Sequence, residues 1–573
     1  MNSRIMLALV AMLAPTALSA QSNADLQKQI EGLKQQIKAV EEKAAAAQEV
    51  DARLVKVETK VAGDNIQWGG DLRTRFESST WTFKPYQQFM GFAQAAGYPG
   101  PLPPGYPYPF VALTQQVPAQ DYTNSVQWST RLRLKMGINI NEHAKIMGRL
   151  TMYKVHGGAD VPVFNGSPNT VQNSFNSAKV PGTDVLRVER ASLVYDFPVG
   201  ILSIGRQNTS DGPPFEVREG GERQATPQAL AVNAMVDGIG FKFPLDKLGM
   251  PEGTLLGICY GVGYESGFGG GGNVKTNAAP VGFNFTNVNW TPQGPNAAAA
   301  TMQVNSIGNL KDSTVLGVMF DMPLLFQLGE SIQSANFYLG FNRFGNMTDI
   351  PYGTTNNFPV PAMPGMGGMP ATQYVTATAN LGDMDQITAT WKHKIGDTFT
   401  YFASYGYIKS NPNGQESQYG AYWNMPANMG GPNYRVTGFG GLLGDAKKSQ
   451  TASAYYVGMR WDPLEKFGVG VEFNHGSPRW FTYSPATGEA TEKLGTRGDV
   501  WEAYAHWQFA KNSAFRLGYL DYKYSHAFSG WHISPAPMSG TWEDAFDLSK
   551  NPMLQYGFPS AVKSIYASIE VKF

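Results

Sequence analysis

A segment in the first half of the sequence gathers charged side chains that could act on passing ions or solutes. Its two prolines, Pro213 and Pro214, stop a strand from continuing through it, because proline fixes its backbone angle and lacks an N–H. Fixed charges on a loop that narrows a passage select solutes by sign and size. A surface loop whose charges are merely solvated is the alternative. The charged residues are Arg206, Asp211, Glu216, Arg218, Glu219, Glu222 and Arg223.

Motifs for catalysis or metal binding are missing from the sequence. It contains no Gly-x-Ser-x-Gly, no His-Glu-x-x-His and no phosphate-binding Gly-Lys-Ser/Thr run. The seven histidines are scattered, and Cys259 is the single cysteine, which excludes an intrachain disulfide and a covalently attached haem. We therefore expect no enzymatic activity, no cofactor and no metal site.

Composition and charge point away from soluble multidomain proteins and from nucleic-acid binding. Lys+Arg and Asp+Glu balance at 45 each, so no bulk charge favours a nucleic acid or a membrane surface. A soluble chain of 573 residues should divide into several domains, yet no division is visible after residue 65. The 64 glycines and 12% aromatic residues suit many strands, aromatic belts and long loops.

The N-terminus has the features of a secretory signal peptide over residues 1–20. Arg4 supplies the positive end, Ile5 to Leu13 the apolar run, and small residues precede a cleavage site after Ala20. No other apolar run approaches the ~20 residues that a spanning helix needs. Any membrane span of the mature chain must therefore be made of strands.

Residues 21–63 are predicted to form a short helical coiled coil. Apolar residues recur at steps of three and four, with a phase break near Gln48, which is the pattern of a heptad seam. A trimer would suit a channel, although these residues do not fix the number of helices, and a lone amphipathic helix is the alternative. The seam residues are Ile30, Leu33, Ile37, Val40, Ala44, Ala47, Val50, Leu54, Val57 and Val61.

From residue 64 onward the pattern predicts an all-β protein, a transmembrane antiparallel β-barrel. Apolar and polar residues alternate, and the apolar face carries Trp, Tyr and Phe rather than charges. Turns alternate between short ones, such as Asn141–His143, and long loops; two of the turns, Pro244–Gly253 and Pro323–Ser334, are of middling length. Eight long loops imply about sixteen strands (roughly 14 to 18) with both ends on the short-turn side. The long loops are 84–123, 156–184, 207–234, 265–312, 346–382, 410–451, 476–498 and 525–560.

The last ten residues predict the strand that closes the barrel. Ile569, Val571 and the terminal Phe573 alternate with polar residues. Outer-membrane proteins characteristically end on such a strand with a final aromatic residue, which the barrel-assembly machinery reads as an insertion signal. This ending predicts the cell outer membrane of a Gram-negative bacterium, surrounding lipid, and an N-terminal segment in the periplasm.

A basic wall is predicted on the inner face of the first three strands. Such cations would either give the channel a mild preference for anions, or pair with carboxylates and anchor the third loop without net selectivity. Asp71 and Glu77 fall on the same face and could compensate some of the charge. The residues are Arg73, Arg75, Arg131, Arg133, Lys135, Lys145 and Arg149.

The run Gly205-Arg206-Gln207, followed by Asp211-Gly-Pro-Pro and Arg218-Glu219, resembles a family of uncharacterised, porin-like bacterial outer-membrane proteins, the domain of unknown function DUF3373. The specific motif spans about residues 187–240. The resemblance implies an envelope barrel with a signal peptide and a short coiled coil. It implies no particular substrate.

Together these features predict an outer-membrane porin. Small hydrophilic solutes would diffuse passively through a channel narrowed by the third long loop, 207–234. The expected partners are lipid, the assembly machinery, such solutes and further copies of the chain, with no nucleic acid. The alternative is a barrel that serves as a sleeve for an exported electron carrier or as an envelope anchor. A sleeve would need a wide and smooth lumen, whereas a porin needs a loop inside it.

Overall fold

The computed structural model of the chain describes its strands and the turns between them. The described residues are 66–94, 110–156, 186–208, 235–264, 311–328, 331–348, 380–415, 441–480, 493–526 and 559–573, with isolated positions between 28 and 40 and residues 230, 232, 290–291, 294–295 and 482. The signal peptide and most of the loop residues lie outside them. The chain divides into two units, Met1–Ile66 and Gln67–Phe573.

In the first unit, the described positions between 28 and 40 are helical. Ile37 and Val40, two residues of the heptad seam, are exposed. The helical coiled coil over residues 21–63 stays a prediction. Within the described residues, no helix is long and apolar enough to cross a lipid bilayer.

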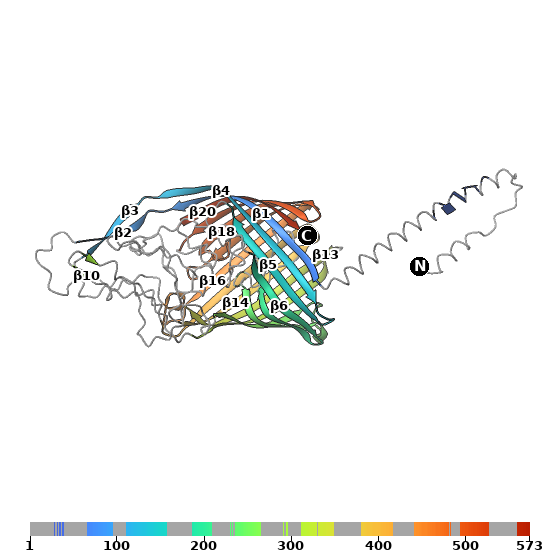
Figure 1. The fold of residues 1–573 in the computed structure, drawn as a ribbon, viewed down its shortest axis with the longest axis horizontal. Coiled ribbons are helices and arrows are strands. Elements are labelled where there is room, and N and C mark those ends of the chain that lie inside the picture. The colour runs from blue at the N-terminus through green and yellow to red at the C-terminus, as the bar shows by residue number, and fades with distance from the viewer. Residues whose placement is uncertain are drawn as a thin grey trace, which may run out of the picture. The chain divides into compact units, whose positions relative to one another are not determined.

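In the second unit, sixteen antiparallel strands form a closed barrel (Figure 1). Each strand pairs with its neighbours in the chain, and β1 pairs with β20 to close the wall. The predicted fold and strand number are confirmed. The strands are β1 (Ile66–Phe83), β4 (Gln120–Asn139), β5 (Ala144–Val155), β6 (Arg187–Phe197), β7 (Gly200–Asn208), β8 (Met235–Pro244), β9 (Leu255–Tyr264), β12 (Ser313–Leu328), β13 (Ser331–Thr348), β14 (Asn380–Ile395), β15 (Phe399–Pro412), β16 (Thr451–Leu464), β17 (Phe467–Gly476), β18 (Gly498–Ala510), β19 (Ser513–Tyr524) and β20 (Pro559–Lys572).

The connections alternate between short turns at one edge and long segments at the other. Only residues 198–199 join β6 to β7, and only 511–512 join β18 to β19, whereas 413–450 separate β15 from β16. One expected turn is wrong: Pro323–Ser334 is mostly strand, since β12 extends to Leu328 and β13 begins at Ser331. β9 pairs with β12 only as far as Asp321, so Pro323 lies where β12 has a single neighbour and a missing N–H is tolerated.

Two short hairpins lie within the long segments. β2 (Tyr86–Gln94) pairs with β3 (Phe110–Val117), and β10 (Trp290–Thr291) pairs with β11 (Gly294–Pro295). The first hairpin extends beyond the barrel wall near β4 (Figure 1). The segment 84–123, expected to be a loop, therefore contains a hairpin and the first residues of β4.

The outer face of the barrel carries aromatic residues at both ends of the strands and aliphatic ones between them. Along β16 the exposed residues are Tyr455, Val457, Met459 and Trp461, while Tyr456 between them is buried inside. Aromatic girdles on both sides of an apolar band are the pattern of a barrel that sits in a membrane. The same order recurs at Trp501, Ala503, Ala505 and Trp507 on β18.

Inside the barrel, aromatic rings cover glycines on the adjacent strand. A Cβ at Gly458 would lie 2.5 Å from the Phe402 ring, and one at Gly518 would lie 2.4 Å from the Tyr566 ring. Both pairs are directly opposite in the register. A glycine facing an aromatic residue lets the ring lie flat on the wall, which is one way for a strongly curved sheet to fill its interior.

The two ends of the barrel chain are joined at Gly70 and Phe573. The Gly70 N–H donates to the Phe573 carbonyl at 2.8 Å, and the Phe573 N–H donates to the Gly70 carbonyl at 3.1 Å. A Cβ at Gly70 would lie 2.4 Å from the Arg133 carbonyl oxygen and 2.7 Å from the Phe573 ring. Only glycine fits at this position without moving the backbone.

We predict that Gly70→Val lowers the yield of folded barrel strongly, because the side chain would collide with the backbone of β4 and with the terminal aromatic ring. The measurement is the fraction of protein that keeps heat-modifiable mobility in gel electrophoresis after refolding into detergent.

Gly137→Val on β4 is the matched control, since a Cβ at Gly137 has no atom within 4 Å. Equal folded yields for the two variants would contradict the proposed role of Gly70 in closure.

Candidate functional site

The lumen wall formed by β1, β4 and β5 carries the predicted basic residues. Arg73 and Arg75 are buried inside β1, and Arg133 and Arg149 are buried on β4 and β5. Arg131 lies opposite Tyr153, and Lys135 opposite Arg149, so these residues share the inner face. Lys145 follows the same alternation, lies opposite Asn139 near the short turn and is half-buried.

Carboxylates on the same wall pair with these arginines. Asp71 accepts hydrogen bonds from Arg133 Nε at 2.8 Å and from Arg131 at 3.0 Å. Glu570 on β20 lies 3.5 Å from the Arg131 guanidinium. The four residues therefore form one compact charged cluster across β1, β4 and β20, close to the junction of the first and last strands.

Two further ion pairs continue the charged wall. Arg75 donates to Glu77 at 2.9 Å, and its guanidinium lies over the Tyr566 ring, 3.7 Å from the centroid. Arg149 donates to Glu189 at 2.6 Å. Glu189 sits at a β-bulge in β6, where the register with β5 shifts between Arg149 and Leu150. The described carboxylate partners of the basic wall thus all lie on strands of the barrel.

Of the residues expected in the constriction loop, the structure places only Arg206, and it lies elsewhere. Arg206 belongs to β7 and is directly opposite Ala191 and Asp237. It shares the outer face with Ile204 and Ile239, which are exposed. Its guanidinium forms two 3.0 Å hydrogen bonds with the Asp237 carboxylate. Assigning Arg206 to the constriction was wrong, because alternation along β7 turns it outward. The other six, Asp211, Glu216, Arg218, Glu219, Glu222 and Arg223, lie outside the described residues.

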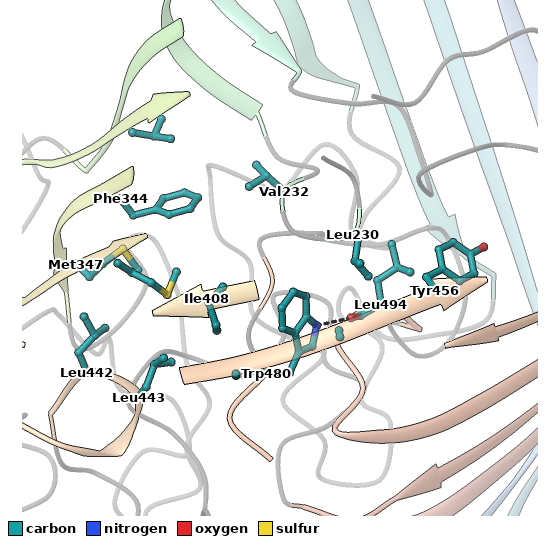
Figure 2. Packing of buried hydrophobic residues seen from close by; sticks show 14 of the residues in the cluster. Leu230, Val232, Phe344, Met347, Ile408, Leu442, Leu443, Tyr456, Trp480 and Leu494 are labelled. Carbon is teal, nitrogen blue, oxygen red and sulfur yellow. Dashed lines mark hydrogen bonds between the residues drawn. The ribbon is translucent and has the colours of Figure 1, made fainter. Parts of the chain in front are cut away.

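The opposite side of the lumen carries an apolar cluster to which residues from the long loops contribute. Leu230 and Val232 come from the third loop, Leu442 and Leu443 from the sixth, and Trp480 and Leu494 from the seventh, and all are buried in one cluster. Figure 2 shows them beside the wall residues Phe344, Ile408 and Tyr456. β14 lies eight strands from β4 in the barrel order, so the loop-covered side faces the basic wall.

Lys493 fixes the seventh loop to the inside of the wall. Its ammonium donates to Glu472 at 2.5 Å, to Glu502 at 2.6 Å and to the Tyr456 hydroxyl at 3.1 Å. Glu472 and Glu502 are opposite each other on β17 and β18. The Lys493 side chain is 2% exposed, and those of both glutamates are 0% exposed. The Lys493 ammonium is needed in this buried site, because removing it leaves two buried carboxylates facing each other without an opposite charge.

Further hydrogen bonds join the seventh loop to the third and hold it in shape. The Thr482 hydroxyl donates to the Leu230 carbonyl at 2.8 Å, and the Trp480 indole N–H donates to the Leu494 carbonyl at 2.8 Å. Arg497, just before β18, donates to the Trp480 carbonyl at 3.2 Å, and burial lowers the pKa of its guanidinium to about 9. The seventh loop thus holds the end of the third loop inside the barrel.

Sequence reasoning did not find Lys493 or its partners as a site. Glu472 and Glu502 fall on inward positions of predicted strands, so an acidic pair on the lumen face could have been read from the alternation. Lys493 could not, because nothing in the seventh loop indicates which residue reaches the wall. Among the described residues, no cluster of histidine, cysteine, aspartate or glutamate is placed to hold a metal ion.

The insertion-signal residues lie on the outer face of the closing strand. Ile569, Val571 and Phe573 are all exposed, and Glu570 between them points into the lumen next to Arg131. Their exposure places the alternating apolar residues where lipid or the assembly machinery could contact them.

The protein is a sixteen-stranded antiparallel β-barrel, in which a charged wall faces a wall covered by loop residues. The chain belongs to DUF3373, a family described as proteins of unknown function, whose model matches residues 121–573. No curated protein matches the chain.

Solved structures with a similar fold are outer-membrane proteins. One is OprB of Pseudomonas putida at high pH, with 9% identity, a TM-score of 0.39, and coverage of 90% of this chain and 96% of that chain. Another is OmpF of Salmonella typhi in complex with daunomycin, with 8% identity, a TM-score of 0.37, and coverage of 89% and 97%. A third is the outer-membrane channel DcaP of Acinetobacter baumannii, with 10% identity, a TM-score of 0.35, and coverage of 89% and 97%.

We predict that Lys493→Met destabilises the folded barrel. The substitution keeps a long apolar stem but leaves Glu472 and Glu502 facing each other without the ammonium, and breaking a buried ion pair from one side costs about 3–5 kcal/mol. The measurement is denaturant unfolding of the detergent-solubilised protein, followed by circular dichroism.

Lys447→Met is the control. Lys447 is exposed and lies in the sixth loop, so this variant should unfold like the wild type. Adding Glu472→Gln and Glu502→Gln to Lys493→Met should recover most of the loss. A Lys493→Met loss no larger than that of the control would contradict the strength assigned to this site.

Proposed function

We propose that the protein is an outer-membrane pore through which small hydrophilic solutes diffuse passively. The observation that carries the proposal is the two-sided lumen, in which a charged wall on β1, β4 and β5 faces loop residues fixed on β12–β16. A charged wall keeps water and polar solutes in the passage, while loops held on the other side reduce its width.

The outer face supports a place in the outer membrane of a Gram-negative bacterium. Exposed aromatic residues border aliphatic ones along the strands, and Ile569, Val571 and Phe573 are exposed along β20 and just after it. Lipid and the barrel-assembly machinery are the partners that fit this face. The N-terminal segment would lie in the periplasm, where the helix could join copies of the chain into trimers.

Narrowing by the third loop is supported at the end of that loop. Leu230 and Val232 are buried against the apolar wall, and Thr482 of the seventh loop binds the Leu230 carbonyl. The charged residues from Asp211 to Arg223 precede this fixed point by seven residues or more. We propose that the third loop narrows the pore together with the seventh, which holds it in place.

A mild preference for anions is the selectivity that the basic wall supports. Arg75, Arg131, Arg133 and Arg149 face carboxylates at 2.6–3.0 Å, so their fields are largely compensated. Lys135 is exposed and lies opposite Arg149, and Lys145 is half-buried and lies nearer the short turn. They are the cations placed to act on ions near that mouth.

A sleeve for a partner protein fits the lumen less well. A sleeve needs a wide and smooth interior, whereas loop residues from three different loops are buried inside this one.

We predict discrete channel openings in planar bilayers, with a reversal potential under a salt gradient that leans weakly toward anions. In Lys135→Glu/Lys145→Glu the reversal potential should move toward cations, because two positive charges near the mouth become negative. The absence of openings from correctly folded protein would contradict the pore.

Lys511→Glu in the β18–β19 turn is the control, since it changes charge at the same edge outside the strands that form the basic wall. If it moves the reversal potential as far as the double variant does, the selectivity does not come from the basic wall.

We predict that Lys493→Met raises the single-channel conductance and the current noise of the open pore. Without the ammonium, the seventh loop loses its bonds to β16, β17 and β18, and the third loop loses the partner that holds Leu230. Lys493→Arg, which keeps the charge, should stay closer to the wild type. Unchanged conductance in Lys493→Met would show that these loops do not limit the passage.

A further inference from the structure

Beneath the loop-covered side of the lumen lies a strip of buried polar side chains on β13 and β14. Asn342 and Gln386 are directly opposite each other, and Thr388 is the next inward residue on β14. All three are buried, with exposures of 2%, 0% and 0%. Within the described residues, Asn342 Nδ2, both polar atoms of the Gln386 amide and the Thr388 hydroxyl have no hydrogen-bond partner.

Such a strip is unusual, because buried polar side chains in folded proteins are almost always hydrogen-bonded. Its surroundings do not supply partners: Ile408 lies opposite Gln386, and Phe344 and Met384 form the next pair toward the loops. Leucine at these positions would suit the apolar cluster better. The packing of the loop residues over this strip therefore does not explain why its side chains are polar.

The wall is thin around the strip. Gly317 lies opposite Asn342, and both Gly340 and Gly406 lie opposite Thr388. Over Gly406, the Trp480 ring and Leu230 come within 2.6 Å and 3.3 Å of where a Cβ would stand. The side chains that fill the space over Gly406 thus come from the loops and not from the barrel wall.

The mixture of groups defines the chemistry of the ligand. Asn342 Nδ2 and Gln386 Nε2 donate, Gln386 Oε1 accepts, and the Thr388 hydroxyl can do either. An anion would satisfy only the donors and a metal ion only the acceptors. Hydroxyl groups both donate and accept, so a hydroxyl-rich solute matches all of these atoms.

We infer that Asn342, Gln386 and Thr388 form a binding subsite for a neutral, hydroxyl-rich solute such as an oligosaccharide. The inference rests on the proposed pore, for which it names a substrate class. Trp480 and Leu230 cover the strip, so the solute reaches it when these loop residues give way, and it favours the state in which they have done so.

The test uses raffinose as a neutral trisaccharide probe on the full-length protein in detergent. Saturation-transfer NMR should show raffinose binding to the wild type, and a polyethylene glycol dimethyl ether of similar mass, which accepts but does not donate hydrogen bonds, should bind more weakly. Asn342→Leu/Gln386→Leu should weaken raffinose binding by about tenfold. The variant loses hydrogen bonds that together change the dissociation constant by about a factor of ten. This variant should fold, because leucine suits the apolar surroundings.

Thr390→Val/Ser404→Ala is the matched control on the same inner wall. Its two hydroxyls hydrogen-bond to each other at 2.8 Å, so their removal leaves the strip intact and raffinose binding unchanged. Lys493→Met, which loosens the cover, should bind raffinose more tightly than the wild type.

Partial block of the bilayer current by raffinose, weakened in the leucine variant, gives a second measurement. Raffinose binding without any current would leave the subsite standing and remove the pore. No raffinose binding, or equal binding by wild type and leucine variant, would overturn the subsite and leave ordered water as the partner of the strip.

Discussion

The pairing of the first strand with the last is the constraint on which the rest of the structure depends. An open sheet leaves a row of unpaired N–H and C=O groups at each edge, which lipid cannot solvate. The ladder from Asp71–Lys572 to Phe83–Pro559 removes both edges, and the bonds between Gly70 and Phe573 complete it. Once the wall is closed, every strand has one face inside and one outside. The alternation of residue types in the sequence then becomes a division between a lumen and an outer surface.

Charges can remain in this lumen because neighbouring strands bring opposite charges to the same face. Asp71 meets Arg131 and Arg133 across the β1–β4 contact, and Glu189 meets Arg149 only because a bulge in β6 brings it there. The pairing also reduces the electric field of the basic wall, since Arg75, Arg131, Arg133 and Arg149 each lie close to a carboxylate. Any selectivity of the proposed pore therefore does not follow from the number of basic residues alone.

The barrel could be predicted from the sequence, whereas the contacts of the loop residues inside it could not. Period-two alternation and short turns depend on local residue types, and the expected barrel of about sixteen strands agrees with the structure. Arg206 was misplaced because its motif ends a strand, where one residue decides between lumen and outer face. Lys493, Trp480 and Leu230 were missed since their role arises from loops that meet in space while lying far apart in the chain. No local pattern records such a meeting.

Coupling between loops changes where the properties of the passage reside. Thr482 holds the Leu230 carbonyl across an interval of 252 residues, and Lys493 in turn holds the seventh loop on Glu472 and Glu502. The end of the third loop at Leu230 is therefore held by the seventh loop. Loss of the Lys493 ammonium would leave two buried carboxylates without an opposite charge. If the third loop narrows the passage, as we propose, its placement depends on the seat of the seventh loop on β17 and β18 as much as on its own residues. Transferring the third loop alone to another barrel would carry over its charges without the contacts that place them.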